Sequence, residues 1–198
     1  MRIMKKTFII LNMILIASEA CRDKSPEIEK TYELSEEMMA YFVNYEVGTK
    51  WIYQDTLDIN NFDTIELISK EHFDVNNGNG TLTKGFVLYY KPKYSKDFKI
   101  RVDPGGNNDC YVQIDPLVTA AGSVVFENYN GIWATGLNYY DSLEITGNKY
   151  YKVINSKSSN SFQQDVSVAQ KTGIISFWKT RGPGVLENYY KLIKTIKL

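Results

Sequence analysis

Turn-forming residues divide most of the chain into short segments in which apolar and polar residues alternate, or in which β-branched and aromatic residues dominate. The clearest segment is FKIRV at residues 98–102, whose apolar residues alternate with Lys99 and Arg101. Successive side chains of a strand point to opposite faces, so this pattern predicts a strand with one buried face. A chain with this period along most of its length is expected to fold mainly as β-structure.

Turn signals separate about ten segments of this kind. The run NNGNG at 76–80 tolerates positive φ angles and predicts a tight turn. Two hairpins are expected, one centred on Gly147-Asn148 and one around Gln170–Gly173, with Gly173 in the left-handed position of a bulged turn. The predicted strands are Lys50–Gln54, Thr64–Ser69, Gly85–Lys91, Phe98–Val102, Tyr111–Ile114, Leu143–Ile145, Tyr150–Ile154, Val166–Ala169, Ile174–Trp178 and Tyr189–Leu198.

One short helix is expected near the start of this region. Ser35 followed by two glutamates is typical of an N-cap with acidic residues at the positive end of the helix dipole. The next residues, MMAYF at 38–42, therefore predict a short helix. The last segment, Tyr189–Leu198, fits either a helical stripe or a strand with a defect at Lys194. Its β-branched residues and aromatic pair favour the strand.

These elements predict a mainly β fold. About ten short strands and one short N-terminal helix, without alternation of helices and strands, exclude a doubly wound α/β fold. We expect a curved antiparallel sheet or a partly closed β-barrel, with the helix against an open face or end of the sheet. A two-sheet β-sandwich is the alternative.

The first 20 residues have the layout of a secretory signal peptide, with a basic start, an apolar run at 7–16 and small residues before Cys21. The apolar run is about half the roughly 20 residues that a membrane-spanning helix requires. Cleavage before Cys21 with attachment of a lipid to its thiol predicts a membrane anchor, and ordinary secretion without a lipid is the alternative. We assign 1–20 to the signal peptide, 21–29 to the lipidated Cys21 and a flexible spacer, and 30–198 to a single β-rich domain.

Three short motifs carry a resemblance to a known group of proteins: GTKWIY at 48–53, ITGNKY at 145–150 and GII at 173–175. With the signal peptide and the cysteine, these turn and core motifs resemble small uncharacterised lipoproteins of Bacteroidota-type cell envelopes. The resemblance implies a shared fold and a lipid-anchored place in the cell envelope, with the outer membrane expected and a secreted or periplasmic soluble protein as the alternative. It implies no chemistry for any residue.

Charge limits the expected partners. Removal of residues 1–20 takes away three basic residues and one acidic residue, which leaves 20 basic and 22 acidic residues and a net charge of −2. Nucleic-acid-binding proteins usually carry a basic excess or a basic stripe, so no nucleic-acid partner is expected. The expected partners are the membrane, through the lipid anchor, and a small ligand or an envelope protein.

Few residues offer the chemistry of an active site. His72 is the one histidine, and a solvent-exposed place on a strand is favoured over a role as general base. Zinc sites need more Cys and His ligands than the chain offers, and the oxygen-rich segments Asp55–Asp63 and Asp103–Asp109 lack the spacing of a calcium loop. Cys110 is expected to pack on a strand, with no disulfide partner if the other cysteine carries a lipid. We expect no catalytic residue, metal or cofactor.

The most unusual feature of the composition is aromatic, because eight of the 15 tyrosines stand in four adjacent pairs. On a strand, each pair places one ring on each face of the sheet. Outward rings on a curved sheet suit stacking on sugars, or contact with a lipid or a protein, although cross-strand packing alone also favours tyrosine. The candidate ligand-facing residues are Tyr89, Tyr90, Tyr139, Tyr140, Tyr150 and Tyr151.

Together these features predict an envelope lipoprotein that is not an enzyme. Its β-rich module is expected to bind a small apolar or aromatic-compatible ligand, or an envelope protein partner. A carboxylate-dependent hydrolase of the cell envelope is one alternative, because acidic residues are plentiful. A purely structural accessory lipoprotein is the other.

Overall fold

The computed structural model describes residues 27–94, 97–105, 109–115, 124–129, 132–133, 137–156, 166–182 and 185–197. The predicted signal peptide and Cys21 lie outside these residues. The described ranges contain one helix and thirteen strands: β1 (Lys30–Tyr32), α2 (Glu36–Phe42), β2 (Lys50–Asp55), β3 (Phe62–Asn76), β4 (Thr81–Pro92), β5 (Phe98–Pro104), β6 (Cys110–Asp115), β7 (Val124–Tyr129), β8 (Ile132–Trp133), β9 (Leu137–Ile145), β10 (Asn148–Ser156), β11 (Val166–Ala169), β12 (Gly173–Gly182) and β13 (Val185–Ile196).

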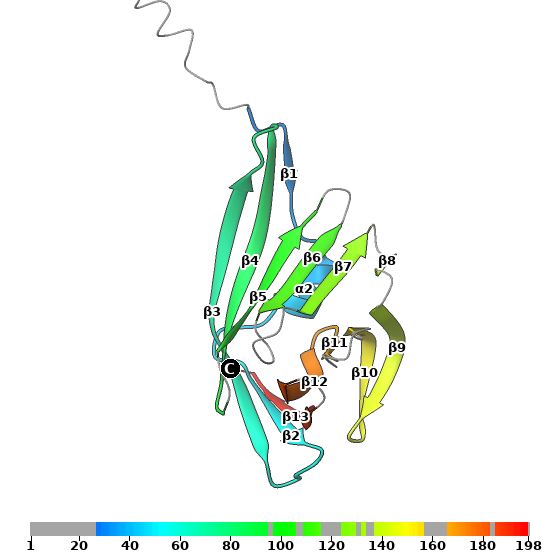
Figure 1. Ribbon diagram of the computed structural model, residues 1–198. Coiled ribbons are helices and arrows are strands. Elements are labelled where there is room, and N and C mark those ends of the chain that lie inside the picture. The colour runs from blue at the N-terminus through cyan, green and yellow to red at the C-terminus, as the bar shows by residue number, and fades with distance from the viewer. Residues whose placement is uncertain are drawn as a thin grey trace, which may run out of the picture.

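The strands form one strongly curved sheet (Figure 1). Neighbours along the sheet follow the order β8-β7-β6-β5-β4-β3-β2-β13-β12-β11-β10-β9 and pair antiparallel, while β1 pairs in parallel with β4. At the two ends of this order, β7 comes close to β10 and β8 comes close to β9, so the sheet nearly closes on itself. The predicted curved sheet or partly closed barrel is therefore confirmed, and the two-sheet sandwich is not formed.

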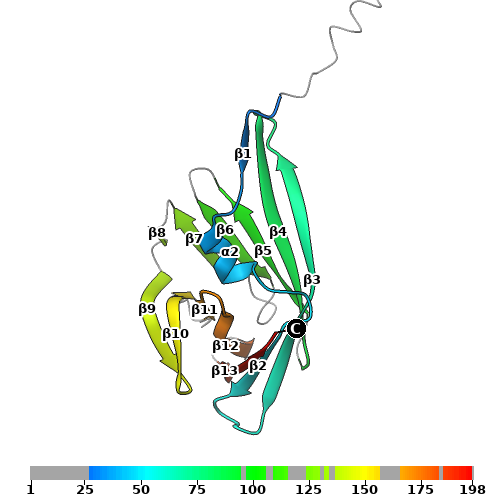
Figure 2. The same cartoon turned by 180° about the vertical axis from the view of Figure 1, so that it is seen from behind.

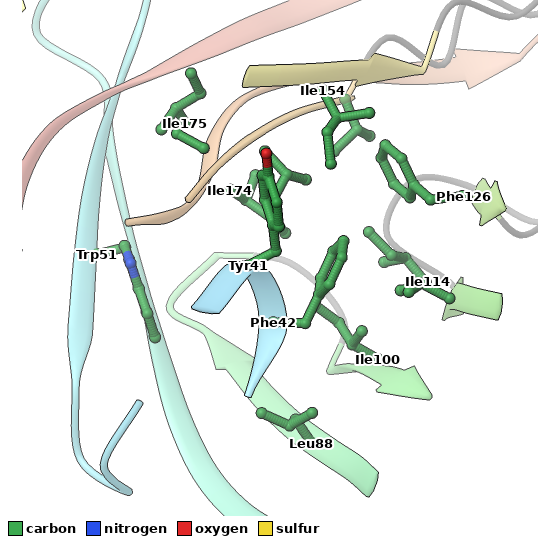
Figure 3. Close-up of a cluster of buried hydrophobic side chains, with 14 of the residues drawn as sticks. Tyr41, Phe42, Trp51, Leu88, Ile100, Ile114, Phe126, Ile154, Ile174 and Ile175 are labelled. Atoms are coloured by element: carbon green, nitrogen blue, oxygen red, sulfur yellow. The ribbon is translucent and has the colours of Figure 1, made fainter. Parts of the chain in front are cut away.

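The predicted N-terminal helix is also confirmed, and it lies inside the curve of the sheet (Figures 1 and 2). The Ser35 side chain caps α2 by accepting a hydrogen bond from the backbone N–H of Met38 at 3.3 Å. Tyr41 and Phe42 point from the helix into the core (Figure 3). Lys70 of β3 donates to the backbone carbonyls that follow the helix, at 3.1 and 3.3 Å, which suits a cation at the negative end of a helix.

The C-terminal segment is a strand, as its β-branched residues predicted. β13 pairs with β2 on one side and β12 on the other. Its register against β2 shifts between Leu192 and Lys194, which is where the sequence predicted a defect. The strand thereby joins the two halves of the sheet.

The turn of the β9–β10 hairpin differs from the prediction by one residue. The two turn residues with positive φ are Thr146 (50°) and Gly147 (76°), so the centre is Thr146-Gly147 rather than Gly147-Asn148. The observed register sets Leu143 opposite Tyr150, whereas the predicted centre would set Leu143 opposite Lys152. The observed register thus sets two side chains opposite each other that both pack against the core, Leu143 and Tyr150, where the predicted register would set a lysine opposite Leu143. In the next hairpin Gly173 has a φ of 87°, as predicted.

The hairpin of β3 and β4 is much longer than its neighbours. β3 has 15 residues and β4 has 12, and no β3 residue beyond Leu67 is buried. We call residues 70–87 the β3–β4 arm; it projects from the barrel toward the end where β1 begins (Figures 1 and 2). At the tip of the arm, the N–H of Glu29 donates to the carbonyl of Gly80 at 2.7 Å. The start of the described chain is thus fixed at the tip of the arm.

Candidate functional site

The inside of the barrel is filled with side chains. Tyr41, Phe42 and Tyr45, from α2 and the turn after it, meet Trp51 and other apolar residues of the strands (Figure 3). The remaining cavity among them measures about 10 Å³. That is about the space of one water molecule, far below the roughly 300 Å³ at which small-molecule sites begin. Among the residues that the structure describes, the part of the concave face around α2 is therefore a packed core and not an open ligand site.

The polar ends of the interior rings bind the protein's own backbone. Trp51 Nε1 donates to the carbonyl of Thr172 at 2.7 Å, and the Tyr53 hydroxyl donates to the carbonyl of Ile174 at 2.8 Å. The Tyr45 hydroxyl donates to the carbonyls of Ala40 and Tyr41 at 3.3 and 3.1 Å. Burial raises the pKa of the Tyr45 and Tyr53 hydroxyls well above the ordinary value, so both remain neutral donors. These rings tie α2 and β12 to the barrel.

The tyrosine pair on β4 has one ring on each face of the sheet. Tyr90 is buried and stacks on Phe98, with ring centroids 4.8 Å apart. Tyr89 faces outward, and its hydroxyl donates to the Glu71 carboxylate at 3.3 Å. Of this pair, only Tyr89 lies where an external ligand has access.

Of the two pairs on β9 and β10, only the β10 pair follows this rule. On β9, Tyr139 and Tyr140 are both exposed, at 45% and 40%, although their cross-strand partners Ile154 and Val153 are buried. Tyr150 is half-buried and its hydroxyl donates to the carbonyl of Leu192 at 3.3 Å, while Tyr151 is exposed. In the order of the sheet, β9 and β10 lie far from β4, so the structure does not bring the candidate tyrosines into one patch.

An open groove lies at the opposite end of the barrel from the arm tip. It has a volume of about 300 Å³, which is within the range of small-molecule sites. One wall is the end of the β2–β3 loop with the start of β3, and the other is the turn that follows β4. The lining residues are Asn60, Asn61, Phe62, Thr64, Lys93 and Tyr94.

Asp55, a buried carboxylate at the end of β2, shapes the first wall of the groove. Its oxygens accept hydrogen bonds from the backbone N–H of Leu57 at 2.9 Å and from Asn61 Nδ2 at 3.3 Å. The same Nδ2 also donates to the Tyr190 hydroxyl at 3.3 Å. These bonds fix the path of the β2–β3 loop and the orientation of the Asn61 amide.

Asp63, also buried, shapes the second wall. Its Oδ1 accepts hydrogen bonds from the backbone N–H groups of Lys93 and Tyr94, at 3.1 and 3.3 Å. The N–H of Lys93 also donates to the carbonyl of Thr64 at 2.9 Å. The turn after β4 is thereby tied to the first residues of β3, although 30 positions separate Asp63 from Lys93.

Two aromatic rings remain open to solvent on the groove. Tyr94 is 61% exposed and Phe62 is 41% exposed. The ammonium group of Lys93 lies 4.6 Å from the centre of the Tyr94 ring. The groove therefore offers aromatic faces, amides, a hydroxyl and one positive charge to a ligand.

The sequence patterns do not predict this groove. Asp55–Asp63 is predicted to be an oxygen-rich turn without the spacing of a calcium loop, and no pattern marks residues 93–94. Within the described residues, His, Cys, Asp and Glu do not gather in a group of three that could hold a metal ion. Of the other oxygen-rich segment, Asp103–Asp109, positions 106–108 lie outside the described residues. Five Asp and Asn residues in one loop were the available signal, because such side chains fix loops by bonding to backbone N–H groups.

The other residues singled out in the sequence lie apart from the groove. His72 is exposed on the arm, and its ring centre lies 4.0 Å from that of Phe86. Cys110 is buried at the start of β6, where burial, with a smaller effect from Asp103, raises the pKa of its thiol to about 12. The thiol is thus protonated at neutral pH, and Cys110 is a residue of the core.

Comparisons of the chain with protein-family models, with curated proteins and with solved structures found no match. In the part of the chain that the structure describes, no helix is both long and apolar enough to span a lipid bilayer.

Proposed function

We propose that the protein is a lipid-anchored protein of the cell envelope whose β-rich domain is a binding module and not an enzyme. The lipid is attached to Cys21, and the ligand binds on the outer surface because the interior is packed. One observation carries the proposal: the chain enters the fold at the tip of the β3–β4 arm, at the opposite end from the groove (Figure 1).

The dimensions of the chain support this arrangement. Five residues lie between Cys21 and Glu27, and the six steps along the chain allow a reach of at most about 20 Å. β3 runs from the groove at Phe62 to the arm tip at Asn76, and its 15 residues span roughly 50 Å at about 3.3 Å per residue. A lipid at Cys21 therefore holds the arm tip near the membrane and directs the groove away from it.

The acidic residues around the groove support binding over hydrolysis. The carboxylates of Asp55 and Asp63 are buried and accept hydrogen bonds from backbone N–H groups that define the loops. A carboxylate that holds a loop in this way has its lone pairs directed at the protein rather than at a substrate. The groove thus has a rigid frame with aromatic and amide groups on its surface.

Labelling with a radioactive fatty acid tests the anchor. We expect label on the wild-type protein and on Cys110→Ala, the matched control that removes the other cysteine. Cys21→Ser is expected to carry no label and to move from the membrane fraction to the soluble fraction. An unlabelled wild-type protein would refute the lipid anchor.

The orientation can be measured separately with a fluorophore on a new surface cysteine, at Asn79→Cys on the arm tip or at Leu57→Cys beside the groove. In vesicles containing lipids with spin-labelled headgroups, we expect stronger quenching at position 79, because the spacer is shorter than the arm. Equal quenching at both positions would contradict the orientation while leaving the anchor intact.

A further inference from the structure

We infer that the groove binds a saccharide, with a sugar ring stacked on the exposed aromatic faces and its hydroxyl groups bound by the surrounding amides. This inference rests on one part of the proposed function, namely that the domain binds a ligand. It does not depend on the lipid anchor. It names residues that the tyrosine pairs did not include: Asn60, Asn61, Phe62, Thr64, Lys93 and Tyr94.

The aromatic groups fit one face of a sugar. A pyranose ring presents C–H groups on its faces and hydroxyl groups around its edge, so it pairs with a flat apolar surface bordered by polar groups. Tyr94 and Phe62 supply such a surface, and 61% and 41% of their areas are open. The groove volume of about 300 Å³ is at the lower end of small-molecule sites, which suits one or two sugar units rather than a long chain.

The polar groups fit the edge of the sugar. Asn60, Asn61 and Thr64 carry amide and hydroxyl groups, which both donate and accept hydrogen bonds as sugar hydroxyls require. The Asn61 Nδ2 is held by Asp55 and Tyr190, which fixes the direction in which its carbonyl oxygen points. The Lys93 ammonium adds a donor beside the Tyr94 ring.

The frame of the groove keeps these groups in place before a ligand arrives. The two walls are held by hydrogen bonds to Asp55 and Asp63, and both carboxylates are 1% exposed. A site that is already ordered loses little conformational entropy on binding, which matters for a weak ligand such as a sugar.

A peptide fits this groove less well. Peptides commonly bind by adding a strand to a free sheet edge, where unpaired backbone groups supply the hydrogen bonds. The groove lies over β3, which pairs with β2 on one side and β4 on the other, and β4 pairs in turn with β5. The backbone groups of these strands form hydrogen bonds within the sheet. A ligand in the groove is therefore bound by side chains.

A glycan array with neutral, N-acetylated and uronic-acid oligosaccharides tests the inference. The probe protein is made from the full-length sequence with Cys21→Ser, so that no lipid is attached. We expect it to retain at least one of these glycan types. For the retained glycan, saturation transfer from protein to sugar, measured by NMR, gives the dissociation constant. We expect Tyr94→Ala to weaken binding by up to about tenfold, which corresponds to a loss of about 1.4 kcal/mol.

Tyr151→Ala is the matched control, because Tyr151 is 62% exposed and also has a lysine ammonium, that of Lys149, 5.5 Å from its ring centre. We expect this variant to bind as the parent protein does. Retention of no glycan would overturn the saccharide as ligand, and equal binding by parent and Tyr94→Ala would overturn the groove as the site. Both results are independent of fatty-acid labelling, so failure of this inference is distinguishable from failure of the anchor.

Discussion

The barrel interior and the groove both gather aromatic side chains, but only the groove leaves them available. The interior cavity beside Tyr41 and Trp51 measures about 10 Å³, and the groove measures about 300 Å³. Tyr53 is 1% exposed and donates its hydroxyl hydrogen bond to the backbone of β12, whereas Tyr94 is 61% exposed with its ring face beside Lys93. The same residue type therefore stabilises the fold in one region and forms a surface in the other.

This difference shows that an abundance of tyrosine does not locate a binding site. What separates the two regions is where the polar atoms bond. Interior hydroxyls bond to backbone carbonyls of α2 and β12, so their rings are held within the core. In the groove, buried carboxylates bond to the loops, and the rings are left uncovered.

The largest expected effect is a loss of stability when an interior tyrosine is removed. Tyr53→Ala removes a fully buried aromatic ring and its hydrogen bond to Ile174, and we expect a loss of about 3–5 kcal/mol in the free energy of unfolding. Tyr94→Ala, the control in the groove, is expected to change that free energy by no more than about 0.5 kcal/mol. Urea unfolding followed by circular dichroism measures both. A large loss in Tyr94→Ala would mean that the groove is part of the core.

A smaller effect is expected from the frame of the groove. Asp63→Ala removes the acceptor for two partly buried backbone N–H groups, those of Lys93 and Tyr94, and we expect a loss of about 1–2 kcal/mol. Hydrogen exchange at the Tyr94 amide should become faster, whereas the Lys93 N–H keeps its hydrogen bond to the carbonyl of Thr64. Asp58→Ala is the control, because its carboxylate accepts from the exposed N–H of Asn60 and should matter little. Unchanged exchange at the Tyr94 amide in Asp63→Ala would contradict the role of Asp63.

The smallest expected effect is a fall in the stability of the fold at alkaline pH, which comes from the interior tyrosines. Burial raises the pKa of Tyr53 and Tyr45 well above the ordinary value near 10. Above about pH 10 the unfolded chain releases these phenol protons while the folded chain keeps them, so stability falls as pH rises and is unaffected below. Each buried tyrosine contributes about 1.4 kcal/mol per pH unit in that range.

Urea unfolding at a series of alkaline pH values measures this slope. Tyr53→Phe keeps the ring and removes the titrating group. In this variant, the fall of the unfolding free energy with pH should correspond to about one proton fewer than in the parent protein. If the slope is the same in Tyr53→Phe and the parent, Tyr53 titrates in the folded state and the interior is open to water.

Much of the fold follows from local signals in the sequence. Alternation predicted β5 within two residues, and the Ser35 cap predicted α2. The length of β3 was missed because a bulge at Ile68 shifts the alternation, so that the pattern before Leu67 does not continue in the same phase after it. The arm beyond the bulge has no buried β3 residues, and therefore it lacks the periodic signal that predicts a strand.

The groove lies beyond local signals for a different reason. Its walls are residues 60–64 and 93–94, and they meet only because β3 and β4 pair antiparallel with Ile65 opposite Pro92. This register is set by the whole hairpin, including the bulge. The local sequence of Asp55–Asp63 predicts a turn. It does not predict which other turn of the chain lies opposite this one.

The parallel pairing of β1 with β4 has a mechanical consequence for a tethered protein. A pull on the N-terminus away from the barrel acts along β1, whose three residues are in register with Thr81, Leu82 and Thr83. Such a force loads the hydrogen bonds between β1 and β4 in shear, so that they bear it at the same time and do not open one after another. In a protein tethered as we propose, β1 therefore transfers the load into the long β3–β4 hairpin.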